Sequence, residues 1–348
     1  MIFQNHVLNS SMIEEAIQAK VLDYTVTEIL EGNGGTITAR VQGRTASKHF
    51  SVFVKVRHGG HTHNALWYLN DMNILDREYV VYGLLETFNV PHAQILASCY
   101  ENANRWTLIL EDLAERCILP TQNNQLDRAA LSMIVKSYAK IHSASLTPRN
   151  QMKLTLEKKI LQVEEGAQVD ETSAQEIYAN LKRYFPGLVS MDEQSFMRAL
   201  HYLESCRKYW INAPRVLVYN DFHVSNLALP INTNEAAILF DWELAGLALP
   251  QFDIVNICYG NYFNCDNLIA EYIELSNSYG TDIDSDQFYR GIEYAKISMN
   301  FYALWLTHLR LQAGRRKAMP AWMLEGGQRL LNGELLLSAE RAIRSIDT

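Results

Sequence analysis

Two short runs of sequence decide how this chain is interpreted: VYNDFHVSN at residues 218–226 and ILFDWE at residues 238–243. They contain Asp221, then Asn226 five residues later, and Asp241 twenty residues after Asp221. Phosphoryl transfer needs a carboxylate that accepts the proton of the attacking hydroxyl, together with oxygen ligands for magnesium. A short loop followed by a hairpin would bring these three side chains together. We therefore expect a magnesium-dependent phosphoryl-transfer site here.

A lysine in a strand supplies the second signal. Lys55 stands between apolar residues in VFVKV at 52–56. Such a lysine can contact nucleotide phosphates when a carboxylate on the neighbouring helix holds it. Glu78 lies in a segment of helical periodicity, 66–88, and Glu86 is a second candidate nearer the end of that segment. The pattern predicts that Lys55 pairs with Glu78.

The order of the predicted elements gives the fold class. Residues 1–110 are typical of three strands, a helix and two further strands, which predicts a small antiparallel sheet. Residues 116–348 are mainly amphipathic helices around the two runs quoted above. Residues 111–115 would form an extended hinge whose backbone faces an adenine edge, since ligand sites favour domain boundaries. We expect an α+β protein with a nucleotide-binding domain at 1–110 and a helical domain, carrying the acceptor site, at 116–348.

Taken in order, these segments resemble the aminoglycoside phosphotransferase and choline kinase family. This family is the small-molecule kinase branch of the protein-kinase-like fold. YNDFHVSN is similar to its HGDxHxxN loop, and FDWELAGLALPQFDI at 240–254 to its IDWExxxxGxPxxDL segment. SYAKIHSAS at 137–145 resembles its LAxLHxx helix, and LILEDL at 108–113 its hinge. The ordered combination is specific, although each piece alone is weak.

The resemblance implies a two-lobed protein-kinase-like fold and a role for each matching residue. It implies transfer of the γ-phosphoryl group of ATP, with Mg²⁺, to a hydroxyl of a small acceptor such as an aminoglycoside, amino alcohol or sugar. The implied roles are catalytic base for Asp221, magnesium binding for Asn226 and Asp241, and nucleotide binding for Lys55, Glu78, Gly34, Glu111 and Leu113.

This chain departs from the family pattern at two places. The histidine that opens the catalytic loop, and normally supports it, is Tyr219 here. The glycine expected seven residues after Asp241 is Ala248, with Gly246 two residues earlier. Two alternatives follow: a catalytically silent nucleotide-binding pseudokinase, or a protein kinase. Retention of the carboxylates and of Lys55 speaks against the first, and the lack of an APE-type segment after Asp241 against the second.

The composition limits the classes of molecule that we expect this protein to bind and the compartment in which we expect it. The chain has 31 Lys and Arg against 39 Asp and Glu, a formal net charge of −8 and a sequence pI near 5.7, which argues against a nucleic-acid partner. It has no apolar run of 18 residues, so we expect no membrane helix, and its beginning lacks a secretory pattern. The five cysteines form no CxxC pair, which predicts ordinary thiols and a cytoplasmic protein. Nothing in the sequence indicates the oligomeric state.

Three further groups of residues have two interpretations each. His58, His61 and His63 would form a polar loop rather than a metal site. The acids at 282–293 match part of a calcium loop, but the required glycine is absent, so we expect them to start a helix capped near Asp286. Aromatic residues between 259 and 305 would be core, with a few of them available for an acceptor pocket.

Overall fold

The computed structural model describes most of the chain, which divides into two compact units. Unit 1 comprises Met1–Leu161, Tyr219–Gly246 and Asn264–Gly280, and unit 2 comprises Gln162–Val218, Leu247–Phe263 and Thr281–Thr348. The described residues are 10–31, 36–58, 76–102, 105–121, 126–157, 170–184, 191–261, 266–312 and 335–347. The domain boundaries at 111–115 stay a prediction.

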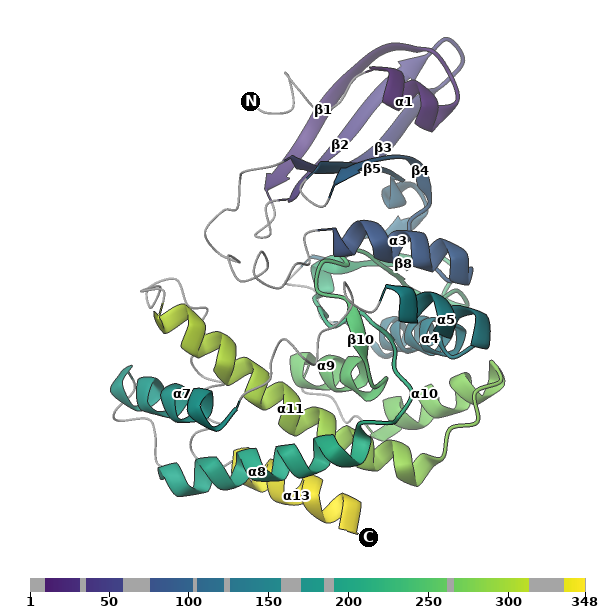
Figure 1. The fold of residues 1–348 in the computed structure, drawn as a ribbon. Coiled ribbons are helices and arrows are strands. Elements are labelled where there is room, and N and C mark those ends of the chain that lie inside the picture. The colour runs from purple at the N-terminus through teal and green to yellow at the C-terminus, as the bar shows by residue number, and fades with distance from the viewer. Residues whose placement is uncertain are drawn as a thin grey trace. The chain divides into compact units, whose positions relative to one another are not determined.

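A five-stranded antiparallel sheet forms the first part of unit 1 (Figure 1). Its spatial order is β1-β2-β3-β5-β4. The strands are β1 (Val21–Glu31), β2 (Thr36–Thr45), β3 (His49–His58), β4 (Ile95–Asn102) and β5 (Arg105–Glu111), with α3 (Arg77–Phe88) between β3 and β4 in the chain. The predicted order of three strands, a helix and two strands is confirmed. Helix α1 (Ser10–Ile17), which precedes the sheet, was not predicted.

The central strand β3 is buried on both faces. Its even-numbered residues from Phe50 to Val56 join a hydrophobic core that includes Ile13 and Ala16 of α1. Side chains alternate between the faces of a strand, so the odd-numbered residues point the other way. On that second face lie Lys55 and Arg57, both buried. Because apolar packing fixes the register of β3, it also fixes the face on which these two cations lie.

The rest of unit 1 consists of helices and a small three-stranded sheet. Tyr272 of α10 (Asp266–Ser278) places its hydroxyl 2.9 Å from Nδ1 of the buried His142 of α4 (Arg128–Ser145), so His142 is hydrogen-bonded in the core. Arg128 and Glu271 join the same two helices by an ion pair of 2.6 Å. The elements are η2 (Leu113–Glu115), β6 (Cys117–Ile118), α4 (Arg128–Ser145), α5 (Pro148–Leu156), η3 (Val224–Asn226), β8 (Leu227–Pro230), β9 (Ile238–Leu239) and α10 (Asp266–Ser278).

Unit 2 is mainly helical. Phe196 and Phe301 pack with ring centroids 5.6 Å apart, so this aromatic pair belongs to the core. Helices α9 (Gln251–Asn261) and α11 (Ser285–Gln312) approach closely at Gly291, where a Cβ atom would lie 2.5 Å from Nε2 of Gln251. The elements are α7 (Glu171–Tyr184), α8 (Glu193–Trp210), β7 (Val216–Val218), β10 (Gly246–Ala248), α9 (Gln251–Asn261), α11 (Ser285–Gln312) and α13 (Leu335–Asp347).

Two expectations need correction in unit 2. Helix α11 does begin with an acidic cap, but the cap is Asp284, whose Oδ1 accepts a hydrogen bond from the Gln287 amide at 2.7 Å. Asp286 lies within the first turn of the helix instead. Cys258 is disulfide-bonded, so the prediction of ordinary thiols was wrong for this residue. Disulfides are rare in the cytosol, and the cytoplasmic location stays a prediction.

Within the described ranges, no helix has the length and apolar character needed to cross a bilayer.

Candidate active site

A buried lysine joins two carboxylates from distant parts of unit 1. Nζ of Lys55 donates to Oε1 of Glu78 at 2.5 Å and to Oδ1 of Asp241 at 3.0 Å. The Lys55 and Glu78 side chains are 5% and 2% exposed, whereas the Asp241 side chain is 44% exposed. The predicted pairing of Lys55 with Glu78 is therefore present in the structure. The Lys55 and Glu78 side chains therefore lie in the core, whereas the Asp241 carboxylate faces outward.

Burial and the neighbouring charges determine the pKa values of Lys55 and Glu78. Burial works against the charged form of Lys55, but Asp241 and Glu78 together raise its pKa well above the ordinary value. Burial raises the pKa of Glu78, and the adjacent ammonium partly offsets that effect. The Trp242 amide also donates to Oε1 of Glu78, at 3.2 Å. Lys55 therefore remains a cation, and Glu78 fixes its head group beside Asp241.

The candidate base lies in the loop that precedes η3. Oδ2 of Asp221 accepts a hydrogen bond of 3.2 Å from Nδ2 of Asn226, and its Oδ1 lies 3.7 Å from Nε2 of His223. Burial raises the pKa of Asp221 to about 6, with Asp241 adding to the rise while His223 and Lys55 oppose it. A carboxyl group with this pKa is mostly ionised at neutral pH and still close enough to it to accept a proton.

Two backbone positions in this region have unusual torsions. Asn220 and Asp241 have φ angles of 61° and 66°, in the left-handed region that most residues avoid. The Asp241 loop is held there by its neighbours: the Phe240 amide donates to the Asn226 carbonyl at 3.2 Å. Such strain persists only when the surroundings enforce it, so the loop is fixed rather than free.

Tyr219 takes over support of this loop. Its hydroxyl donates to the Phe240 carbonyl at 2.6 Å, and its ring packs edge-on against Trp242 with centroids 4.8 Å apart. Both rings are almost completely buried. The residue that departs from the family pattern thus contacts the residues on both sides of Asp241: the backbone of Phe240 and the side chain of Trp242.

A second ion pair, which sequence reasoning missed, runs beside the first. Nη2 of Arg57 lies 3.1 Å from Oε1 of Glu243, and both side chains are largely buried. Burial raises the pKa of Glu243 to about 7, with Asp241 and Glu78 adding to the rise and Arg57 opposing it. Spacing could have found this pair, because Arg57 lies two residues after Lys55 and Glu243 two residues after Asp241.

The predicted hinge segment contacts the sheet through Asp112. This buried carboxylate accepts from Ser51 Oγ at 2.6 Å and lies 2.8 Å from Nε of Arg40. The Glu111 amide donates to the Gln94 carbonyl at 3.0 Å. The structure thus ties the predicted adenine-binding segment to β2, β3 and the chain before β4.

Leu113 begins the short helix η2 directly after this anchor, and its carbonyl accepts from the Arg116 amide at 3.1 Å. The nucleotide roles of Glu111 and Leu113 stay predictions.

The side chains around Asp221 suit a hard cation. Because Nδ2 of Asn226 donates to Asp221, its amide oxygen is the atom left to bind a ligand. Asp241 offers an outward-facing carboxylate, and oxygen donors of these kinds are what Mg²⁺ prefers. Oε2 of Glu78 is buried and has no hydrogen-bond partner among the described residues, so this part of the site holds surplus acceptor capacity.

Some predicted residues lie outside the described part of the chain. Gly34, His61 and His63 are among them, as is the His58 side chain. Over the described ranges, no group of three or more His, Cys, Asp and Glu side chains could hold a metal by itself. The candidate magnesium site differs from such a cluster because it includes an asparagine and would be completed by nucleotide phosphates.

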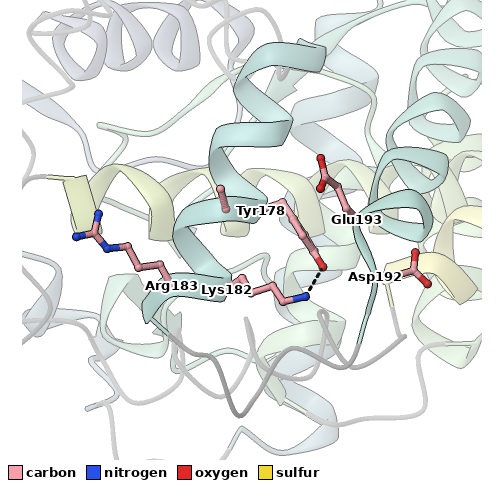
Figure 2. Close-up of a pocket in the computed structure, with 6 residues that line it drawn as sticks. Tyr178, Lys182, Arg183, Asp192 and Glu193 are labelled. Atoms are coloured by element: carbon pink, nitrogen blue, oxygen red, sulfur yellow. Dashed lines mark hydrogen bonds between the residues drawn. The ribbon is translucent and has the colours of Figure 1, made fainter.

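A pocket of about 490 Å³ opens in unit 2 and shares no residue with the cluster above. Figure 2 shows it between α7 and the start of α8, with Nζ of Lys182 donating to the Tyr178 hydroxyl at 3.3 Å. That hydroxyl in turn donates to the Met191 carbonyl at 2.8 Å. The lining residues are Tyr178, Ala179, Lys182, Arg183, Asp192 and Glu193, none of which the sequence had suggested.

Comparison with solved structures supports the fold. Similar structures include an ethanolamine kinase from Plasmodium vivax (16% identity, covering 97% of this chain and 87% of that one, TM-score 0.56). The choline kinase LicA from Streptococcus pneumoniae matches at 14% identity, covering 94% and 99%, with TM-score 0.53. A putative aminoglycoside phosphotransferase from Ralstonia eutropha matches at 14% identity, covering 97% and 98%, with TM-score 0.53. The predicted two-lobed, protein-kinase-like α+β fold is therefore confirmed.

Comparison at the level of sequence identifies the family. No curated protein sequence gives a significant match. The family model described as "Ecdysteroid kinase-like family" matches residues 35–281, which span more than two thirds of the chain and include Lys55, Glu78, Asp221 and Asp241. With the kinase fold and this match both in place, the chain belongs to the ecdysteroid kinase-like family.

Proposed function

We propose that this protein transfers the γ-phosphoryl group of ATP to a hydroxyl group of a small molecule. The observation that carries the proposal is the double ion pair of Lys55 with Glu78 and Asp241, beside the hydrogen-bonded Asp221 and Asn226. One cation, one proton acceptor and two oxygen ligands are the parts that phosphoryl transfer requires.

Each side chain then has one task. Asp221 orients the acceptor hydroxyl and takes its proton, for which a pKa of about 6 is suitable near neutral pH. Lys55 holds the phosphates of the nucleotide, and Glu78 keeps its ammonium group in position. Asn226 and Asp241 would hold magnesium, which when bound neutralises charge on the phosphate oxygens. Most of the rate enhancement would come from positioning and electrostatics.

The nucleotide and acceptor are proposed by analogy. LicA has been solved in complex with AMP, and an aminoglycoside 2′-phosphotransferase in complex with GDP. We expect ATP as donor, contacted by Glu111, Leu113 and Gly34 in addition to Lys55. The family description and the structural neighbours point to small alcohols as acceptors, with ecdysteroids, choline, ethanolamine and aminoglycosides as the classes to test.

Tyr219 gives no reason to propose a silent site. The family histidine at this position supports the catalytic loop, and Tyr219 does so through the Phe240 carbonyl. The base and the predicted metal ligands are all retained. We therefore propose an active phosphotransferase rather than a pseudokinase.

The test is a coupled phosphotransfer screen. Purified protein, ATP and Mg²⁺ are incubated with single members of the acceptor classes named above and with sugars, and ADP release is followed. Asp241→Ala serves as the inactive control. Release that depends on one acceptor and disappears in Asp241→Ala is the expected result. Turnover that is unchanged in Asp241→Ala contradicts the proposal.

A further inference from the structure

We propose that Arg57 is a positioning residue for the proposed phosphoryl-transfer reaction. Its guanidinium ties Glu243 to the start of β2 and so fixes the loop that presents Asp241. This inference rests on the proposed function for its catalytic meaning, while the tether itself is independent of it.

The first observation is that the two ion pairs run in parallel. Lys55 and Arg57 are two residues apart on β3 and therefore point to the same face. Asp241 and Glu243 are two residues apart in the facing loop. Lys55 pairs with Asp241 at 3.0 Å and Arg57 with Glu243 at 3.1 Å. Strand β3 is thus joined to this loop by two ion pairs rather than one.

The second observation is that Arg57 is itself fixed. Nη2 of Arg57 also donates to the Thr36 hydroxyl at 3.4 Å. Thr36 is the first residue of β2 and is the register partner of Arg57 across the β2–β3 ladder. The guanidinium is thus held at the end of β2 that follows the glycine-rich segment. Both contacts, to Thr36 and to Glu243, come from Nη2, which carries two N–H donors.

The third observation is the backbone strain at Asp241. Its φ of 66° is unfavourable for a residue with a side chain, so tethers must hold it. Tyr219 holds the carbonyl of Phe240, and Glu78 accepts from the amide of Trp242. Both of these contacts act through the backbone at residues 240 and 242. Glu243 supplies a side-chain anchor on the far side of Asp241, and Arg57 is its ion-pair partner.

The fourth observation is the charge balance at this face of β3. Three carboxylates, those of Glu78, Asp241 and Glu243, face two cations, Lys55 and Arg57. The influence of Asp241 and Glu78 on Glu243 is repulsive. Arg57 is the cation in contact with Glu243, and it opposes that repulsion. Arg57 therefore offsets a repulsion that the cluster itself creates.

Two measurements on Arg57→Met test the inference. Amide hydrogen exchange of the segment 240–245 reports directly on the tether, without nucleotide. The Mg²⁺ concentration that gives half-maximal ATP binding reports on the presentation of Asp241. Loss of a group that orients a metal ligand costs about 10–100-fold in metal affinity, so we expect a shift of that size. The control is Arg44→Met, which removes a cation from an exposed ion pair with Asp23 on the same sheet.

Glu243→Gln is the second variant, since it breaks the same pair with little change in volume. It should reproduce both effects, and the double variant should be no worse than either single variant. If Arg57→Met does not fold, Glu243→Gln alone decides the question. Arg57→Lys keeps the charge without the fork and should recover only part of the Mg²⁺ effect.

The outcomes are distinct. Faster exchange at 240–245 with a raised Mg²⁺ requirement, in Arg57→Met but not Arg44→Met, supports the inference. Unchanged exchange, an unchanged Mg²⁺ requirement, or additive effects in the double variant overturn it. If the wild-type protein binds no ATP with Mg²⁺, the proposed function fails, and the exchange measurement still decides whether Arg57 tethers the loop.

Discussion

Replacing Lys55 by methionine removes the cation of the buried cluster and nearly preserves the volume of its stem. Within the part of the chain that the structure describes, Glu78, 2% exposed, would then keep only the Trp242 amide as a hydrogen-bond donor. A buried carboxylate without a cation is expensive, and breaking a buried pair typically costs about 3–5 kcal/mol. Glu78 can avoid that cost by taking up a proton. The loss of unfolding free energy therefore cannot exceed the free energy of protonating Glu78, which depends on pH.

The limit follows from the ordinary pKa of a glutamate. A carboxyl group with an ordinary pKa of 4.5 lies three units below pH 7.5, so keeping it protonated there costs about 4 kcal/mol. At pH 5.5 the difference is one unit, and the cost is about 1.4 kcal/mol. The pKa of Glu78 in the folded variant lies above its unfolded value. The stability is therefore retained at low pH and lost as pH rises. Lys55→Met should lose up to about 4 kcal/mol of unfolding free energy at pH 7.5 and about 1.4 kcal/mol at pH 5.5.

Urea denaturation at the two pH values, followed by tryptophan fluorescence, measures this difference. Trp106 and Trp242 are both buried in unit 1 and report on the relevant part. The variant Lys55→Met with Glu78→Gln should recover most of the loss and remove its pH dependence. Arg44→Met is the matched control for loss of a cation from an exposed pair. A loss that is equal at both pH values, or that Glu78→Gln does not relieve, refutes the reasoning.

Three further predictions concern the base, the loop support and the helix crossing. Because Asp221 must be ionised to act, kcat/KM should fall about tenfold per pH unit below pH 6, and a flat profile from pH 5 to 8 would exclude Asp221 as the base. Tyr219→Phe leaves the Phe240 carbonyl without its buried donor and should cost about 1–3 kcal/mol in urea denaturation, whereas a change below about 0.5 kcal/mol would show that the bond contributes little. Gly83→Ala, at an exposed helix position with open space, should raise stability by about 0.5–1 kcal/mol in urea denaturation, and Gly291→Ala should fall below that control because its Cβ would lie 2.5 Å from the buried Gln251 side chain; equal effects of the two variants would show that Gln251 moves aside freely.

Local patterns sufficed for the sheet. The apolar alternation of β3 predicted a strand, and it also fixed Lys55 on the face opposite the core. The conspicuous oxygen-bearing residues of 218–226 and 238–243 could be recognised as a set because their spacing along the chain is short. The pairing of Lys55 with Glu78 was within reach for the same reason, since both lie on adjacent elements.

Contacts between distant segments were harder to foresee. Arg57 and Glu243 are 186 residues apart in the chain, and the signal for their pairing is indirect: each lies two residues after a member of the Lys55–Asp241 pair. The role of Tyr219 depends on where the Phe240 carbonyl lies, which no local pattern gives. The short helix α1 was missed because only Ile13 and Ala16 are buried, too few apolar positions to stand out.

The central claim is that the Lys55–Asp241 cluster is a magnesium-dependent nucleotide site, and isothermal titration of ATP tests it without knowledge of the acceptor. Titrations are made with Mg²⁺, with EDTA, and on Asp241→Asn. The account predicts binding in the micromolar to millimolar range that Mg²⁺ strengthens, and loss of that strengthening in Asp241→Asn. Absence of binding at millimolar ATP in the wild-type protein, or an equal effect of Mg²⁺ in Asp241→Asn, would contradict it.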